Sequence, residues 1–167
     1  MEYPVNPPAR VTINLGEDGV AQVRLIRADK MNALDPDMFA ALLDAGRVLR
    51  ALKGLRCVVL SGEGRSFCAG LDMSSMADSG RRRENPLTTR THGNTNPPQE
   101  VALQWRNLPV PVIAAVHGVC FGGGLQIASG ADIRVMTPDA RLAVMELKWG
   151  AGPRYGRLRA VARHGPR

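Results

Sequence analysis

The stretch PVIAAVHGVCFGGGLQIASGADIRV, residues 111–135, decides the fold of this 167-residue chain. It opens with a strand-sized apolar run, passes through three consecutive glycines, and continues as an apolar helix over residues 124–129 that ends near Gly130. A second strand-sized run follows at residues 132–136. Strand, glycine turn, helix and strand in this order predict an α/β architecture.

The residues upstream show the same alternation. Two β-branched runs, residues 11–15 and 20–26, flank an Asp-Gly turn and predict a β-hairpin. Apolar residues recur at helical spacing behind Pro36, and Asp35 is placed to cap that helix. Residues 56–60 form a short apolar run between glycines, which predicts a buried strand.

Composition divides the chain into an N-terminal extension (1–10), a core (11–149) and an atypical Arg-rich tail (150–167). Within the core, residues 77–98 are poor in bulky apolar side chains and predict a mobile surface loop, with a short helix over residues 99–108 after it. The tail holds five Arg and no acid, so it supplies most of the formal charge of +7. It has the composition of a basic arm, but also of a truncation or a shifted reading frame.

The remaining composition excludes several classes of protein. The core is nearly balanced in charge and aromatic residues make up only 4% of the chain, so we expect no nucleic-acid partner. No apolar stretch is long enough to span a membrane, and residues 1–10 lack a secretory signal, so we expect no membrane partner and a cytoplasmic location. Three cysteines without C-x-x-C spacing predict buried thiols and no metal site.

Two glycine-containing turns, residues 66–72 and 117–124, each follow an apolar strand. Backbone N–H groups at such a turn and at a helix start favour a negative charge, which predicts an anion or oxyanion site. The alternative is that the glycines only allow a helix to pack tightly on the sheet. Neither turn has the residue spacing of a P-loop or of a dinucleotide-binding motif. The G-x-S-x-G motif of serine hydrolases is absent. A nucleophile pair of Cys68 and His117 is supported only by the presence of both residues in the sequence.

Four motifs, taken in order, resemble the crotonase superfamily of enoyl-CoA hydratases and isomerases. They are RADKMNALD (27–35), SFCAGLDM (66–73), the stretch at 111–135, and ARLAVMELKWG (140–150). The resemblance implies a crotonase-like spiral of repeated ββα units that acts on an acyl-CoA thioester, with no separate cofactor because coenzyme A is part of the substrate. Family members continue into a C-terminal helical region that forms trimers or hexamers. We expect that region to be missing here, which would leave a truncated core with exposed apolar surface.

By the same resemblance, the backbone N–H groups of Leu71 and Gly123 hold the thioester oxygen while an enolate forms. The family's hydratases use two glutamates, at the positions of Gln126 and Glu146. An amide cannot exchange a proton near neutral pH, so Glu146 as the one proton carrier favours isomerisation over hydration. The alternative functions are a hydratase and an inactive remnant that binds acyl-CoA weakly or not at all. The alternative role of Glu146, if the surrounding motif is disregarded, is a solvated surface carboxylate or an ion-pair partner of Lys148.

The resemblance also implies a set of residues around the substrate. Lys30 would meet the ribose or pyrophosphate end of coenzyme A, and the turn that it opens would line the cleft with its backbone. The other implied residues are Met31 and Ala33 in that turn, Ala69, Asp72 and Met73 on the adenine and pantetheine side, Val119 and Phe121 on the acyl side, and Gly122. Simple packing is the alternative role for Met73, and a solvated charge in a loop is the alternative for Lys30.

Overall fold

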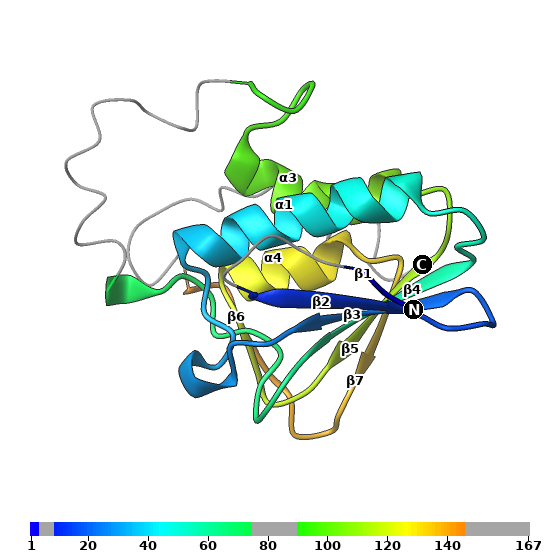
Figure 1. Ribbon diagram of the computed structural model, residues 1–167. Helices are drawn as coiled ribbons and strands as arrows, with labels where there is room; N and C mark the ends of the chain where they lie inside the picture. Colours follow the sequence, from blue (N-terminus) through cyan, green and yellow to red (C-terminus); the bar gives the residue numbers. More distant parts are fainter. Residues whose placement is uncertain (4–8, 75–89, 146–167) are drawn as a thin grey trace, which may run out of the picture.

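The computed structural model describes residues 1–3, 9–74 and 90–145 (Figure 1). Its main sheet has the strand order β1-β2-β3-β4-β5-β7, and a separate two-stranded sheet pairs β6 with β8. The pairs β1/β2 and β2/β3 are antiparallel, and all later pairs are parallel. The strands are β1 (Glu2–Tyr3), β2 (Val11–Leu15), β3 (Val20–Leu25), β4 (Cys57–Gly62), β5 (Val112–Val116), β6 (Val119–Phe121), β7 (Ile133–Met136) and β8 (Arg141–Ala143).

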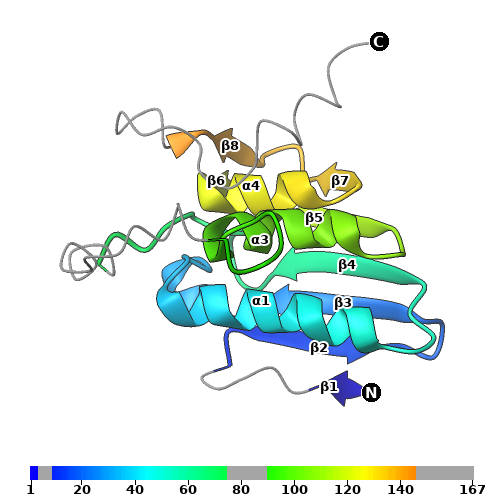
Figure 2. The same cartoon turned by 90° about the horizontal axis from the view of Figure 1, so that it is seen from above.

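Three α-helices cover one face of the main sheet, with α3 lying between α1 and α4 (Figures 1 and 2). These helices are α1 (Pro36–Ala51), α3 (Pro97–Leu103) and α4 (Gly123–Gly130), and two short 3₁₀ helices occupy Ala28–Lys30 and Gln104–Asn107. None of the helices in the described ranges has the length and apolar character needed to cross a lipid bilayer. The mixed α/β architecture expected from the sequence is therefore confirmed.

The helix caps explain where the helices begin. The Asp35 carboxylate accepts a 2.7 Å hydrogen bond from the Met38 N–H, which confirms the predicted cap of α1. Helix α3 begins at Pro97, earlier than predicted and inside the expected 77–98 loop, because Asn96 and Gln99 form a capping box. Its last turn tightens into the 3₁₀ helix. Residues 75–89 of that loop, and the tail, lie outside the described residues.

The core fills the space between the sheet and the helices. Strands β2 to β5 alternate inward apolar residues with outward ones, and the inward set packs against α1, α3 and α4. Trp105 is fully buried and donates its indole N–H to the Val101 carbonyl at 2.9 Å. By contrast, β7 leaves Ile133, Val135 and Met136 about half exposed in the described part of the chain.

Candidate active site

The first two motifs are joined by backbone hydrogen bonds in the manner of parallel strands. The Ala69 N–H donates to the Met31 carbonyl at 2.9 Å. The Leu34 N–H then donates to the Gly70 carbonyl at 2.8 Å, and the Asp72 N–H donates to the Leu34 carbonyl at 3.0 Å. These three bonds place the turn at residues 31–34 directly beside Leu71.

The second motif is joined in the same way to the glycine-rich third motif. The Cys68 N–H donates to the Val119 carbonyl at 3.1 Å, and the Phe121 N–H donates back to the Cys68 carbonyl at 3.0 Å. The Gly122 N–H donates to Ala143 at 2.8 Å, so the start of the fourth motif joins the same cluster. All four motifs therefore meet at one place, although they are spread over more than a hundred residues of sequence.

Two glycines in this cluster have no room for a side chain. Gly70 has φ +90°, and a Cβ on it would lie 2.8 Å from the Phe121 carbonyl oxygen. A Cβ on Gly124 would lie 2.6 Å from the Cys68 carbonyl oxygen. Tight packing is thus a sufficient reason for the glycine at position 124. This agrees with the alternative interpretation of the glycine run, in which the glycines only allow close packing.

The same geometry leaves two backbone donors available. Within the described ranges, neither the Leu71 N–H nor the Gly123 N–H donates a hydrogen bond to a backbone carbonyl. Gly123 is the first residue of α4, whose N-terminus carries the positive end of the helix dipole. Two N–H donors on motifs in direct contact can stabilise a negative oxygen between them.

The turn at residues 28–34 is held in an uncommon backbone conformation by a buried amide. Met31 and Asn32 have φ of 50° and 55°, in the left-handed region. The Asn32 side chain is fully buried and accepts a 2.8 Å hydrogen bond from the Arg27 N–H. It donates at 2.9 Å to the carbonyls of Glu63 and Ser66, so every bond fixes the turn against its neighbours.

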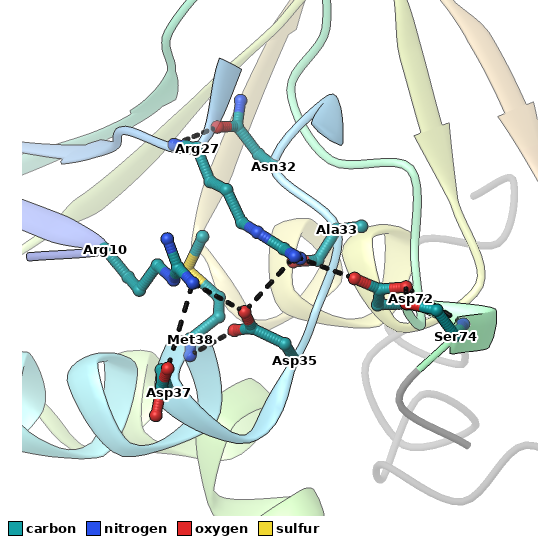
Figure 3. A network of polar contacts seen from close by, with 9 residues as sticks. All are labelled: Arg10, Arg27, Asn32, Ala33, Asp35, Asp37, Met38, Asp72 and Ser74. Atoms are coloured by element: carbon teal, nitrogen blue, oxygen red, sulfur yellow. Dashed lines mark hydrogen bonds and ion pairs between the residues drawn. The ribbon is translucent and has the colours of Figure 1, made fainter. Parts of the chain in front are cut away.

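A network of charged side chains ties the site segments together (Figure 3). The Arg27 guanidinium lies 2.8 Å from the Asp72 carboxylate and 3.3 Å from that of Asp35, and donates to the Ala33 carbonyl at 3.0 Å. All three charged side chains are almost buried. The Ser74 hydroxyl donates to Asp72 at 2.6 Å, and this bond, with Arg27 beside it, lowers the pKa of Asp72 to about 2.

Comparison with known proteins identifies the family. A family model described as enoyl-CoA hydratase/isomerase matches residues 16–167. The chain belongs to the enoyl-CoA hydratase/isomerase family. It is 29% identical to the enoyl-CoA hydratase EchA19 of Mycobacterium tuberculosis, over 93% of this chain and 59% of that relative. It is 28% identical to the mitochondrial Delta(3,5)-Delta(2,4)-dienoyl-CoA isomerase of mouse, over 90% of this chain and 47% of that protein.

A solved structure agrees with this assignment. The enoyl-CoA hydratase of Mycobacterium smegmatis superposes with a TM-score of 0.75 at 32% identity, over 95% of this chain and 59% of that one. The crotonase-like fold predicted from the four motifs is thereby confirmed. The chain spans about half to three-fifths of the length of these family members.

The family's proton-carrier positions differ in what the structure shows of them. Gln126 is fully buried on α4, and its N–H donates to the Gly122 carbonyl at 3.1 Å. Glu146 lies outside the described residues, three positions after Ala143 of β8. The structure therefore brings the start of the fourth motif to the glycine turn and describes nothing of the Glu146 side chain.

The expected substrate-binding residues belong to the hydrogen-bonded segments of this cluster or are next to them in the sequence. Lys30 is exposed at the end of a 3₁₀ helix, and Met73 is 58% exposed. The remaining ones are half-buried or buried: Met31, Ala33, Ala69, Asp72, Val119, Phe121 and Gly122. Asp72 already has Arg27 and Ser74 as partners, so its carboxylate connects the second motif to the first.

Cysteine nucleophile chemistry is not supported. Cys68 is fully buried and donates its S–H to the Asn32 carbonyl at 3.0 Å, and burial raises the pKa of the thiol to about 12. His117 instead places Nε2 2.9 Å from the Gly64 carbonyl. The two residues therefore do not form the nucleophile pair considered from the sequence. The described residues also contain no group of three His, Cys, Asp or Glu side chains placed to hold a metal ion.

Two features of the site were missed from the sequence. Arg27 and Asn32 both lie in the first motif, but neither was singled out. The signal for Asn32 was its residue type, because Asn adopts the left-handed conformation more readily than most residues. No local signal identifies Arg27, since its partner Asp72 lies 45 positions away in the sequence.

Proposed function

We propose that the chain binds an acyl-CoA thioester and moves the double bond of an enoyl-CoA by way of an enolate. The observation that carries this proposal is the pair of N–H donors, at Leu71 and Gly123, on two turns joined by backbone hydrogen bonds. The loss of one such donor costs on the order of 3 kcal/mol of transition-state stabilisation in enzymes that use them. The donors act through the main chain, so the Leu71 side chain has no part in them.

In the proposed step, the Glu146 carboxylate removes a proton from the α-carbon of a β,γ-enoyl thioester. The electron pair of the broken C–H bond enters the conjugated system, and the negative charge gathers on the thioester oxygen between the two N–H groups. The protonated Glu146 then returns its proton to the γ-carbon, and the double bond ends between the α- and β-carbons. One carboxylate suffices because the proton that leaves is the proton that returns.

The amide at position 126 favours isomerisation over hydration. Addition of water calls for a group that removes a proton from the water, and a glutamine cannot do so near neutral pH. The relatives include proteins named as hydratases and as isomerases, so family membership alone leaves both reactions open. The difference between Gln126 and a glutamate supports the isomerase.

The test compares the full chain with Glu146→Gln and Gln126→Glu in two assays, isomerisation of a β,γ-enoyl-CoA and hydration of an α,β-enoyl-CoA. We expect isomerisation in the wild type, a loss of at least about 10²-fold in Glu146→Gln, and hydration only in Gln126→Glu. Unchanged isomerisation in Glu146→Gln would refute its role as proton carrier. Hydration by the wild type would establish the hydratase instead.

Equilibrium titration with an enoyl-CoA distinguishes an enzyme from an inactive remnant. Binding in the titration together with turnover supports the proposal. Binding without turnover in either assay overturns it in favour of a remnant that only holds acyl-CoA. Absence of both binding and turnover overturns the assignment of the substrate itself.

A further inference from the structure

We infer that Arg27 is a positioning residue that holds the Leu71 N–H donor in place, by linking the Asp72 carboxylate to Ala33 and Asp35 of the first motif. This inference rests on the proposed function, since it assigns Arg27 a role in the same oxyanion site. It concerns a side chain that touches neither of the two donors directly. Arg27 acts through the segment that carries Leu71.

The peptide units on both sides of Leu71 are held by hydrogen bonds. The Gly70 carbonyl before it and the Asp72 N–H after it both bond to Leu34, at 2.8 and 3.0 Å. These two bonds leave the Leu71 N–H facing away from Leu34, which agrees with the parallel bridge between the two residues. The position of this donor therefore depends on how residues 70–72 lie against the first motif, and the Asp72 side chain provides a further contact between the two segments.

Arg27 supplies that hold with a forked side chain. Its Nη2 lies 2.8 Å from Asp72 and 3.3 Å from Asp35, while its Nη1 donates to the Ala33 carbonyl at 3.0 Å. Its own backbone N–H is fixed by the buried Asn32 amide. A lysine offers a single point charge and cannot reproduce two ion pairs and a hydrogen bond made from one planar group.

Arg10 provides a matched control in the same network (Figure 3). It lies 2.9 Å from Asp35 and 3.8 Å from Asp37, so it shares one carboxylate with Arg27. Its ion pairs hold the start of α1, while those of Arg27 also reach Asp72. Arg10→Gln thus removes a charge from the network without loosening the segment that carries Leu71.

The kinetic test measures kcat and KM for Arg27→Gln, Arg27→Lys, Arg10→Gln and Asp72→Asn. We expect Arg27→Gln to lower kcat at least about tenfold, with KM changed by less than about threefold, because a misplaced donor weakens mainly the transition state. Arg27→Lys should recover less than half of the loss, and Arg10→Gln should stay within about twofold of the wild type. Arg27→Gln combined with Asp72→Asn should be no worse than the more severe single variant, since the two residues act as a unit.

Equal kcat in Arg27→Gln and Arg10→Gln, or additive losses in the double variant, would show that Arg27 is merely structural and overturn the inference. The amide NMR signals of the free protein give a readout that does not depend on turnover. Arg27→Gln should shift or broaden the Leu71 and Asp72 signals, and Arg10→Gln should leave them unchanged. Unmoved signals in Arg27→Gln overturn the inference even where the wild type has no activity, whereas absent wild-type turnover alone contradicts only the proposed function.

Discussion

Replacing Gly70 by alanine separates two reasons why a glycine is needed there. Its φ of +90° lies in a region that residues with a Cβ rarely adopt. The new Cβ would also lie 2.8 Å from the Phe121 oxygen and 3.3 Å from the Phe121 carbonyl carbon. These are backbone atoms, so the glycine turn of α4 must move to make room.

Gly54 is the matched control for the conformational part of this cost. It has φ +79°, and nothing lies within 4 Å of the position where its Cβ would stand. Gly54→Ala should therefore lower the free energy of unfolding by about 1 kcal/mol, from backbone strain alone. Gly70→Ala adds the displacement of packed backbone, about 2 kcal/mol more, for a total of about 3 kcal/mol.

Urea unfolding followed by tryptophan fluorescence measures both variants, since Trp105 is fully buried in the core. The same preparations are assayed for enoyl-CoA isomerisation. Gly70→Ala should lose turnover because it moves both Leu71 and the turn before Gly123, while Gly54→Ala should keep it. If the two variants are destabilised equally, or if Gly70→Ala keeps its turnover, the close contact between the two turns does not set the site geometry.

Two further predictions concern acid stability and association. The pKa of Asp72 is lowered to about 2 from an ordinary 3.8, so its ionised form stabilises the fold fully above about pH 5 and ceases to do so as the pH falls towards 2. Ser74→Ala should therefore lower the free energy of unfolding by about 1 kcal/mol at pH 6 and by much less at pH 2. Urea titrations at both pH values measure this difference. An equal loss at the two pH values would show that the hydrogen bond of Ser74 to the ionised Asp72 carboxylate is not its cause. Val135 is 60% exposed beside Ile133 on β7, so Val135→Lys should reduce the association of the purified chain in light scattering, and unchanged scattering would show that this surface does not mediate it.

The local patterns of the sequence predict most of the main sheet and its helices. The hairpin of β2 and β3 follows from two β-branched runs around an Asp-Gly turn, and α1 from the cap at Asp35. By contrast, β1, β6 and β8 have only two or three residues each, and they exist because a distant strand pairs with them. Periodicity needs a longer window than that, so these strands were not predicted.

The candidate site likewise has features that the sequence motifs predict and features that they do not predict. The resemblance implies that the two glycine turns hold one thioester oxygen between them, and the structure joins these two turns by backbone hydrogen bonds. The Arg27–Asp72 ion pair, and the hydrogen bonds of the buried Asn32 amide to the carbonyls of Glu63 and Ser66, join residues 31 to 45 positions apart in the sequence. Such contacts follow from the fold and leave no local pattern.

In the proposed site, the fold positions the backbone N–H donors, and the side chains determine which groups can carry a proton. In the proposed function, the two N–H groups would polarise a thioester whatever stands at position 126, so the choice of reaction would depend on the proton carriers. Gln126 is fully buried on the first turn of α4, where a carboxylate would lose its hydration but gain from the helix dipole. An amide avoids both effects and keeps the position neutral at every pH. In the proposed mechanism, the glutamine at position 126 leaves Glu146 as the one proton carrier and does not alter the two N–H donors, which is the condition under which a single glutamate would move a proton from carbon to carbon.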